Sequence, residues 1–400
     1  MAEAVKEILL FPQNEVQVQN MLPVAEVLRN EYEVNPVFLD MSGIYHQELL
    51  GGCPFERLEP GIRMERAFYL SSPLEKVRSV RSFIHYAEYL AERFGLFVMG
   101  NDGALQRVLM DKGGLRGILL LDGILSNKEY SFLDMIRNGG LNSYDIKQSI
   151  RSLVARTASG LPFSYYLPSE VGSSKSLERI FVASRYIKEL LTAKGVDGGR
   201  IEITGVPRFG DLVRFGENLP VRSGGEAKEL MLVTQGYLWH NENIYDELQQ
   251  KEIASFIDVV GRFKDRGFRV NIRVHPRDDR NRYEQYTEKD FVSISTMDLA
   301  EDIARSDGVF GFNSTVLIQA LMLRKPAFSL MRNGQFWRFQ KEFTACDEFI
   351  KIYSDEELFQ NLDLLKRDGI VVAEGAYTRF VSEENLRGAE NIARRLNEYL

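Results

Sequence analysis

The residues of this sequence best suited to chemistry include His275, one of four histidines, which is followed directly by Pro276 and Arg277. They end an alternating apolar run at residues 269–274 that predicts a β-strand. An imidazole can donate a hydrogen bond to a phosphate and titrates near neutral pH, and the guanidinium groups of Arg273 and Arg277 match phosphate geometry. We therefore predict a phosphate-binding turn in which His275 is also a candidate catalytic group. A histidine that only caps a loop is the alternative.

A second candidate site is the turn formed by Asn313, Ser314 and Thr315. It joins an apolar run at residues 308–312, which we expect to be a strand, to an apolar helical pattern. A side-chain oxygen at a helix start accepts backbone N–H groups, and the remaining N–H groups there attract an anion. The carboxyl ends of parallel strands are where open α/β sheets bind ligands. With the His-Pro pair, this turn predicts the phosphate side of a nucleotide-sugar site, although a plain helix cap would use the same residues.

Two acidic turns are candidates for the catalytic carboxylate. Asp122 and Gly123 follow the uncharged run at residues 117–121, and Asp102 lies in an Asn-Asp-Gly turn after the preceding predicted strand. A carboxylate at such a place can deprotonate an acceptor hydroxyl or attack an anomeric carbon. Because Asp-Gly pairs are also common in turns that have no catalytic role, the sequence leaves open which aspartate acts.

Two further segments are candidates for contacts with the ligand. Gln235 and Gly236 follow the first predicted strand of the second half, where a glycine lets the main chain approach a diphosphate or a sugar. Residues 204–211 read Thr-Gly-Val-Pro-Arg-Phe-Gly-Asp, and we expect their Arg208 to point into the region between two domains. A structured linker is the alternative for this run.

Strand-like runs alternate with helical ones along most of the chain, which is the pattern of layered α/β proteins. A chain of 400 residues is longer than one hydrophobic core usually supports, so we expect two domains. We predict strands at residues 7–11, 34–39, 96–99, 117–121, 179–183 and 202–205, and then at 229–234, 270–274, 292–295, 309–312 and 327–330.

The predicted architecture is of the GT-B type, with two Rossmann-like domains facing a central cleft. The N-terminal, acceptor-side domain is expected at residues 1–212, with an insertion near 126–176, and the nucleotide-binding domain at 228–378. Residues 379–400 are expected to form a helix that packs back toward the N-terminal domain. Residues 211–227 contain several Gly and a Pro and are the candidate linker. A single large doubly wound sheet is the alternative.

Composition and motifs exclude several other functions. The net charge of −7 and pI near 5.5 disfavour a nucleic-acid binder. Cys53 and Cys346 have no metal or redox spacing, and we find neither a dinucleotide Gly motif nor a P-loop, so we expect no resident cofactor and no metal. No signal peptide or membrane-spanning run is recognised, which predicts a cytoplasmic protein. The basic, aromatic segment 74–94 could contact the inner face of the cytoplasmic membrane, with a solvated helix face as the alternative.

Three features resemble the bacterial GT-B glycosyltransferases of capsule and lipopolysaccharide biosynthesis, in particular the sialyltransferase-like and β-Kdo transferase-like groups. They are the His-Pro pair, the Ser-Thr pair before an apolar helix and Lys325-Pro326, and the run at residues 203–208. The resemblance implies that His275, Ser314 and Thr315 bind the nucleotide phosphate and ribose. It also implies that the Asp-Gly pair at 122–123 supplies the catalytic carboxylate. Leu121 departs from the pattern, because a second acidic residue often stands at that position.

We therefore predict a metal-independent glycosyltransferase that moves Kdo or a related 2-keto sugar acid from a CMP-activated donor to a bacterial surface glycan or glycolipid. Arg208 and Arg277 are expected to pair with the phosphate or with the donor carboxylate. Some of the same motifs resemble CDP-glycerol glycerophosphotransferases and non-hydrolysing UDP-GlcNAc 2-epimerases. The alternatives are thus a CDP-glycerol or UDP-sugar transferase, an epimerase-like enzyme, or a non-catalytic docking subunit. The acceptor, the stereochemical outcome and the oligomeric state stay open.

Overall fold

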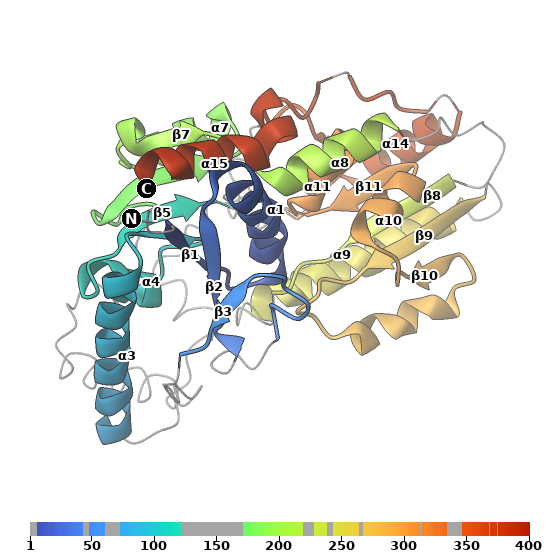
Figure 1. Cartoon of the computed structure of the whole chain (residues 1–400). Coiled ribbons are helices and arrows are strands. Elements are labelled where there is room, and N and C mark those ends of the chain that lie inside the picture. Colours follow the sequence, from blue (N-terminus) through green and yellow to red (C-terminus); the bar gives the residue numbers. More distant parts are fainter. Residues whose placement is uncertain are drawn as a thin grey trace. The chain divides into compact units, whose positions relative to one another are not determined.

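The computed structural model describes residues 6–42, 48–60, 73–121, 171–218, 228–237, 243–263, 267–312, 314–333, 346–367, 369–373 and 375–400. The chain divides into two compact units, each with its own parallel sheet (Figure 1). Unit 1 comprises Met1–Ile124, Asn142–Gly210 and Arg379–Leu400, and unit 2 comprises Leu125–Leu141 and Asp211–Thr378.

Unit 1 contains a seven-stranded sheet with the order β3-β2-β1-β4-β5-β6-β7, in which every pair of neighbours is parallel. The central strands are buried along most of their length, as expected for a parallel sheet with helices on both faces. The strands are β1 (Glu7–Phe11), β2 (Asn35–Leu39), β3 (Glu56–Leu58), β4 (Leu96–Met99), β5 (Arg116–Leu120), β6 (Leu177–Val182) and β7 (Ile201–Ile203). The helices of this part are α1 (Glu15–Tyr32), α3 (Pro73–Arg93), α4 (Ala104–Asp111), α7 (Arg185–Ala193), η3 (Gly198–Arg200), η7 (Glu383–Arg387) and α15 (Gly388–Tyr399). Helix α8 (Pro207–Glu217) begins in unit 1 and continues beyond Gly210 into unit 2.

The predicted return of the C-terminal helix to the N-terminal half is confirmed. Helix α15 packs against α1 and buries Ile392, Ala393 and Leu396 in the same hydrophobic cluster as Leu28. Helix α1 begins at an asparagine cap, since the Asn14 side chain accepts the N–H of the third helical residue at 2.9 Å. The core of unit 1 therefore joins residues from the two ends of the described chain.

Glu202 of β7 links α15 to the sheet through hydrogen bonds. Its carboxylate accepts hydrogen bonds from Arg395 Nε at 2.6 Å, from the Tyr399 hydroxyl at 2.6 Å and from Arg179 Nε at 3.1 Å. Burial alone would raise the pKa of Glu202, but these hydrogen bonds and the two positive charges outweigh it and hold that pKa below its ordinary value near 4.5.

We expect the substitution Glu202→Gln to lower the free energy of unfolding by about 1–3 kcal/mol at pH 7, because it removes the charge from three hydrogen bonds. A carboxyl whose pKa is lower in the folded state stabilises the protein above its ordinary pKa, and this stabilisation is lost as the pH falls through the folded-state value. Urea unfolding between pH 7 and pH 3 should therefore show a flatter acid decline in the variant. Glu178→Gln is the control, because Glu178 pairs with the more exposed Arg116. An equal loss in both variants would contradict this account of Glu202.

Unit 2 contains a six-stranded parallel sheet with the order β10-β9-β8-β11-β12-β13. The strands are β8 (Lys228–Val233), β9 (Phe268–Arg273), β10 (Val292–Ile294), β11 (Gly308–Gly311), β12 (Ala327–Leu330) and β13 (Ile350–Ile352). The helices are α9 (Asn243–Gly261), η6 (Arg280–Glu288), α10 (Leu299–Arg305), α11 (Val316–Met322) and α14 (Asp355–Arg367).

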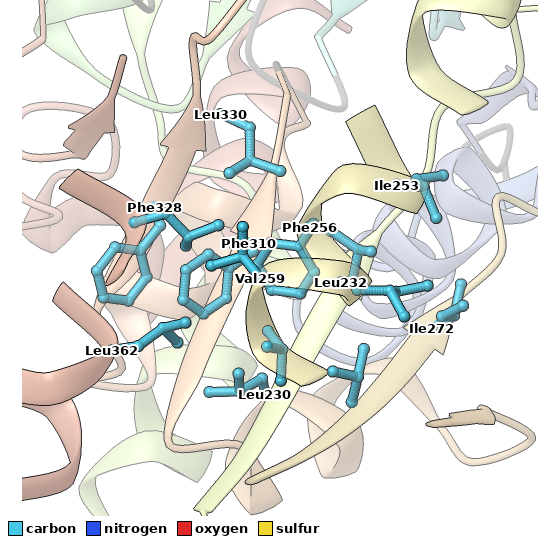
Figure 2. Packing of buried hydrophobic residues seen from close by; sticks show 14 of the residues in the cluster. Leu230, Leu232, Ile253, Phe256, Val259, Ile272, Phe310, Phe328, Leu330 and Leu362 are labelled. Atoms are coloured by element: carbon cyan, nitrogen blue, oxygen red, sulfur yellow. The ribbon is translucent and has the colours of Figure 1, made fainter. Parts of the chain in front are cut away.

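The core of unit 2 lies between this sheet and helices α9 and α14. Figure 2 shows Phe310 of β11 and Phe328 of β12 side by side, with stacked rings whose centroids are 4.2 Å apart, and Phe256 of α9 close to them. Each fully buried aromatic side chain of this kind contributes about 1.5–3 kcal/mol through burial of apolar surface. Tyr283 of η6 belongs to the same cluster. The core thus supports the strand ends where the predicted binding residues lie.

The predicted fold class is confirmed, since the chain forms two parallel α/β units. Three differences concern single elements. Strands β3 and β13 were not predicted, because three residues are too few for a periodic signal. Residues 379–400 were predicted as one helix, but helical structure begins only at Glu383, where the 3₁₀ helix η7 is followed by α15. The first part of the predicted linker at 211–227 is helical, because α8 continues to Glu217 despite its glycines.

No helix in the described ranges is both long enough and apolar enough to cross a membrane.

Candidate functional site

The order of the strands in unit 2 places the predicted phosphate-binding residues at one edge of its sheet. The chain passes from β8 to β9 and β10 on one side, and then continues at β11 on the other side of β8. Such a reversal, beyond the carboxyl ends of the strands, is where open α/β sheets bind ligands. Gly236 follows β8, His275 follows β9 and Ser314 follows β11. Three separate predicted segments are therefore brought to three adjacent strand ends.

His275 lies in a tight turn whose backbone is held at both ends. Its N–H donates to the Thr234 hydroxyl oxygen at 2.9 Å, and its carbonyl accepts the N–H of Asp278 at 2.9 Å. The N–H of Arg277 donates to Nδ1 of the imidazole at 3.2 Å. Because Nδ1 is an acceptor here, the neutral ring that fits this geometry carries its proton on Nε2. The side chain is half-buried, while Pro276 and Arg277 are exposed.

Gly236 provides the space that the imidazole occupies. A Cβ atom at this position would lie 2.7 Å from Nδ1 and 3.1 Å from Cε1 of His275. The glycine was predicted to let the main chain approach a ligand, and the structure adds that it admits the histidine ring. The neighbouring Gln235 is fixed through its backbone, because its N–H and carbonyl bond the Gln249 side chain at 2.7 and 3.0 Å.

We expect Gly236→Ala to displace the imidazole and to lower turnover by a factor on the order of 100, the usual cost of misplacing a reacting group by about 1 Å. Stability should change little, since the ring can move outward. Activity and melting temperature measured in parallel would check this. Gly311→Ala is the matched control, because a Cβ at that strand end would make contacts of 3.5 Å or longer. Full activity in Gly236→Ala would show that the position of the ring is unimportant.

At the end of β11, Ser314 acts as the predicted hydroxyl cap. Its Oγ accepts the N–H of Val316 at 3.3 Å and its carbonyl accepts the N–H of Leu317 at 3.0 Å. Thr315 already has helical backbone angles, and its hydroxyl makes no capping bond. Only one of the two predicted hydroxyls therefore caps α11. Asn313 lies outside the described residues, but the buried Ser329 hydroxyl fixes the preceding backbone by donating to the Phe312 carbonyl at 2.8 Å.

Arg273, which we expected to favour phosphate binding, is engaged elsewhere. Its guanidinium pairs with the buried Asp302 at 2.9 Å and bonds the Met297 carbonyl, so that it anchors the start of α10. Arg277 stays a candidate for the phosphate, because its side chain is exposed beside His275.

In unit 1 the corresponding reversal of strand order lies between β1 and β4, and Asp102 follows β4. Asp102 is buried, and Oδ2 accepts the Gly172 N–H at 3.1 Å and lies 3.6 Å from Arg107 Nη2. Burial raises the pKa of Asp102, against the opposing effects of Arg107 and the Gly172 and Ser174 backbones. Asp102 therefore holds the turn at residues 171–174, and its catalytic role stays a prediction.

The other acidic candidate cannot be placed, because Asp122 and Gly123 lie outside the described residues. Leu121, which precedes them, lies at the carboxyl end of β5, where its N–H donates to the Phe181 carbonyl at 3.0 Å. No group of three or more potential metal ligands occurs within the described part of the chain.

The run at residues 204–211 has a structural role that the sequence did not reveal. The N–H of Val206 donates to Asn385 Oδ1 at 2.7 Å, and Gly205 and Gly210 both lie against the backbone near Asn385. Arg208 lies in the first turn of α8, where its N–H donates to the Asn20 side chain and its guanidinium lies 4.6 Å from the centre of the Phe209 ring. The two glycines thus allow the backbone of the C-terminal segment to pack closely against this run. A ligand contact for Arg208 stays a prediction.

Sequence reasoning missed the polar residues that hold the His275 turn from behind. Thr234, Gln249, Asp278 and Tyr283 come from four different segments, and three of them are fully buried. A polar residue in an otherwise apolar pattern, such as Thr234 at the end of β8, was the available signal.

Two parallel α/β units, of which unit 2 bears candidate ligand groups at its strand-order reversal, define the GT-B class of fold. Solved structures with this fold include the UDP-GlcNAc 2-epimerase from Methanocaldococcus jannaschii, with a TM-score of 0.56 at 13% identity over 98% of this chain and 100% of that chain. The UDP-GlcNAc 2-epimerase from Neisseria meningitidis bound to UDP-GlcNAc matches with a TM-score of 0.56 at 10% identity, over 98% and 100%. The H444N variant of the wall teichoic acid polymerase TagF matches with a TM-score of 0.53 at 15% identity, over 98% and 88%.

These similar structures are enzymes, and at such identities the likeness concerns the fold alone. No protein-family model matches the chain, and no curated protein matches it in sequence.

Proposed function

We propose that this chain is a glycosyltransferase that binds a nucleotide-activated donor at the strand-order reversal of unit 2. The observation that carries the proposal is the placement of the His275 turn and the Ser314 helix start on the strands that flank β8. Gly236, between them, leaves the imidazole room. Side-chain and backbone N–H donors at the ends of adjacent strands are suited to a phosphate.

In the proposed reaction, the bond between the anomeric carbon and the phosphate oxygen breaks, and its electron pair stays on the phosphate. His275 Nε2–H donates to this developing charge, and the backbone N–H groups of Ser314 and Thr315 are the further proposed donors. The acceptor oxygen forms the new bond to the anomeric carbon and loses its proton to a carboxylate. Asp122 and Asp102 are the candidates for that base. If the configuration is retained, the carboxylate first displaces the phosphate and forms a covalent intermediate, and the acceptor oxygen then displaces the carboxylate from the anomeric carbon.

For the donor, we propose CMP-linked Kdo or a related 2-keto sugar acid, with a surface glycan or glycolipid as the acceptor. The support is the resemblance of the His-Pro and Ser-Thr motifs to those of transferases that use CMP-activated sugars. Arg277, exposed beside His275, is the proposed partner of the donor carboxylate or the phosphate.

A second candidate is a 2-epimerase acting on UDP-GlcNAc. It is favoured by the similarity of the fold to two such epimerases over the full length of those chains. An epimerase interconverts two UDP-sugars without an acceptor, whereas a transferase releases the nucleotide.

The test is a thermal-shift and calorimetric screen against CMP, CDP, UDP, GDP and ADP, with the matching nucleosides as controls. A ligand that binds the native state raises the melting temperature, and nucleosides without phosphate should give a much smaller shift. CMP selectivity supports the proposed donor and directs the next assay to CMP release from CMP-Kdo. UDP selectivity, with epimerised sugar as the product, would favour the second candidate. The absence of binding to every nucleotide would refute both and leave the docking subunit.

A further inference from the structure

A set of buried polar side chains lies directly behind the His275 turn. Thr234 directly follows β8, Gln249 lies on α9, and Tyr283 lies on η6, and each is 0% exposed. Buried polar groups of this kind are costly unless they are hydrogen-bonded to one another. Their partners therefore indicate what the set holds in place.

Hydrogen bonds from this set reach both ends of the turn. The His275 N–H donates to Thr234 Oγ1 at 2.9 Å. The Tyr283 hydroxyl donates to Asp278 Oδ2 at 2.5 Å. The Asp278 N–H returns to the His275 carbonyl at 2.9 Å. Thr234 thus holds the backbone of the first residue of the four-residue turn, and Tyr283 holds the side chain of its last residue, Asp278.

Charge determines which group is the donor in the hydrogen bond between Tyr283 and Asp278. Asp278 is ionically paired with Arg282, whose Nη1 lies 3.1 Å from Oδ1, and Arg282 also pairs with Asp246 at 2.5 Å. Burial and the neighbouring carboxylate raise the pKa of Tyr283, so its hydroxyl keeps its proton and stays a donor. The Tyr283 hydroxyl therefore donates, and the Asp278 carboxylate that is paired with Arg282 accepts.

Gln249 connects Tyr283 to the end of β8. Besides its two bonds to the Gln235 backbone, its Nε2 lies 3.5 Å from the Tyr283 hydroxyl. The strand end that carries Gly236 and the turn that carries His275 are therefore held by one network.

We propose that Tyr283, Thr234 and Asp278 are positioning residues that fix the His275 turn so that the Arg277 N–H meets Nδ1 and the ring proton stays on Nε2. This inference rests on the proposed function for its consequence, because an Nε2–H donor is what a leaving phosphate requires. The geometry itself does not depend on the ligand. The competing explanation is that these hydrogen bonds stabilise unit 2 without influencing the position or the tautomer of the His275 imidazole.

The test compares Tyr283→Phe with Tyr286→Phe. Both tyrosines lie on η6 and contact the same hydrophobic cluster, and each would lose only its hydroxyl. The Tyr286 hydroxyl lies 3.3 Å from the Gln250 carbonyl oxygen. Among the contacts described, it makes no hydrogen bond to the residues that hold the His275 turn. Long-range ¹H–¹⁵N spectra of the histidine rings report the tautomer without any ligand, and His275→Gln assigns the signal.

We expect Nε2-protonated His275 in the wild type and in Tyr286→Phe, and a mixture of tautomers in Tyr283→Phe. Affinity for the nucleotide selected by the screen should fall about 10- to 100-fold in Tyr283→Phe alone, as for the outer partners of metal-ligating histidines. A wild-type tautomer and affinity in Tyr283→Phe would overturn the proposal, as would an equal loss in Tyr286→Phe. If the wild type binds no nucleotide, the proposed function fails, and the tautomer measurement still decides whether the network positions the ring.

A second pair of variants covers the case in which Tyr283→Phe does not fold. Thr234→Val removes the hydroxyl at nearly constant shape, and Thr234→Ser keeps it. The proposal requires that serine retain the wild-type tautomer and affinity and that valine lose both. Equal behaviour of the two variants would overturn it.

Discussion

Replacing His275 by alanine should lower turnover by about 100- to 1000-fold, the usual cost of removing one donor to a developing negative charge. The fold should persist, because the side chain is half-buried and the turn is held by backbone groups of His275 and Asp278 that the substitution leaves in place. Circular dichroism and thermal unfolding would establish the fold, and nucleotide release by the variant would give the turnover.

The control for this prediction is His85→Ala. His85 lies on α3 with 79% of its side chain exposed, and it pairs only with the exposed Glu88 among the contacts described. Its removal should leave turnover unchanged. A folded His275→Ala protein with unchanged turnover and unchanged nucleotide affinity would show that the phosphate site lies elsewhere.

The largest expected effect on stability is that of Gly210→Ala. A Cβ atom on Gly210 would lie 2.1 Å from the carbonyl oxygen of Asn385, which is main chain and cannot rotate away. Alanine is normally favoured over glycine in a helix by about 1 kcal/mol, and Gly210 lies within α8. We nevertheless expect a loss of about 3 kcal/mol or more, because the C-terminal segment must move to admit the methyl group.

Urea unfolding would measure this loss, and limited proteolysis around residues 379–387 would show whether the segment has detached. The matched control is Gly95→Ala, since no atom lies within 4 Å of a Cβ at Gly95. If Gly210→Ala were as stable as Gly95→Ala, the C-terminal segment could move to admit the methyl group with little loss in the free energy of unfolding.

The sheets could be predicted because their strands are buried on both faces, which produces short apolar runs such as those of β1, β4 and β12. Edge strands of three residues carry no such signal. Residues 204–211 were predicted to contact a ligand, whereas Gly205 and Gly210 are required by the distant backbone at Glu384 and Asn385. A local pattern cannot report which distant segment comes close.

The candidate site was predicted in part for the same reason. His275, Gly236 and Ser314 stand at strand ends, so topology alone brings them to one edge of the sheet. Thr234 and Tyr283 act through partners on other elements, and no local spacing relates them. For Arg273 the local sequence was misleading. Its position beside His275 predicted phosphate binding, whereas its guanidinium pairs with Asp302.

The location of α15 also bears on the order in which the protein is made. On the ribosome, Gly388–Tyr399 emerge after all of unit 2, yet they complete the core of unit 1. Until then the face of α1 that includes Leu28 has no α15 to cover it. Unit 2 can therefore finish folding during synthesis before unit 1, although most of unit 1 is translated first. During that interval the nascent chain exposes an apolar surface of the kind that chaperones bind.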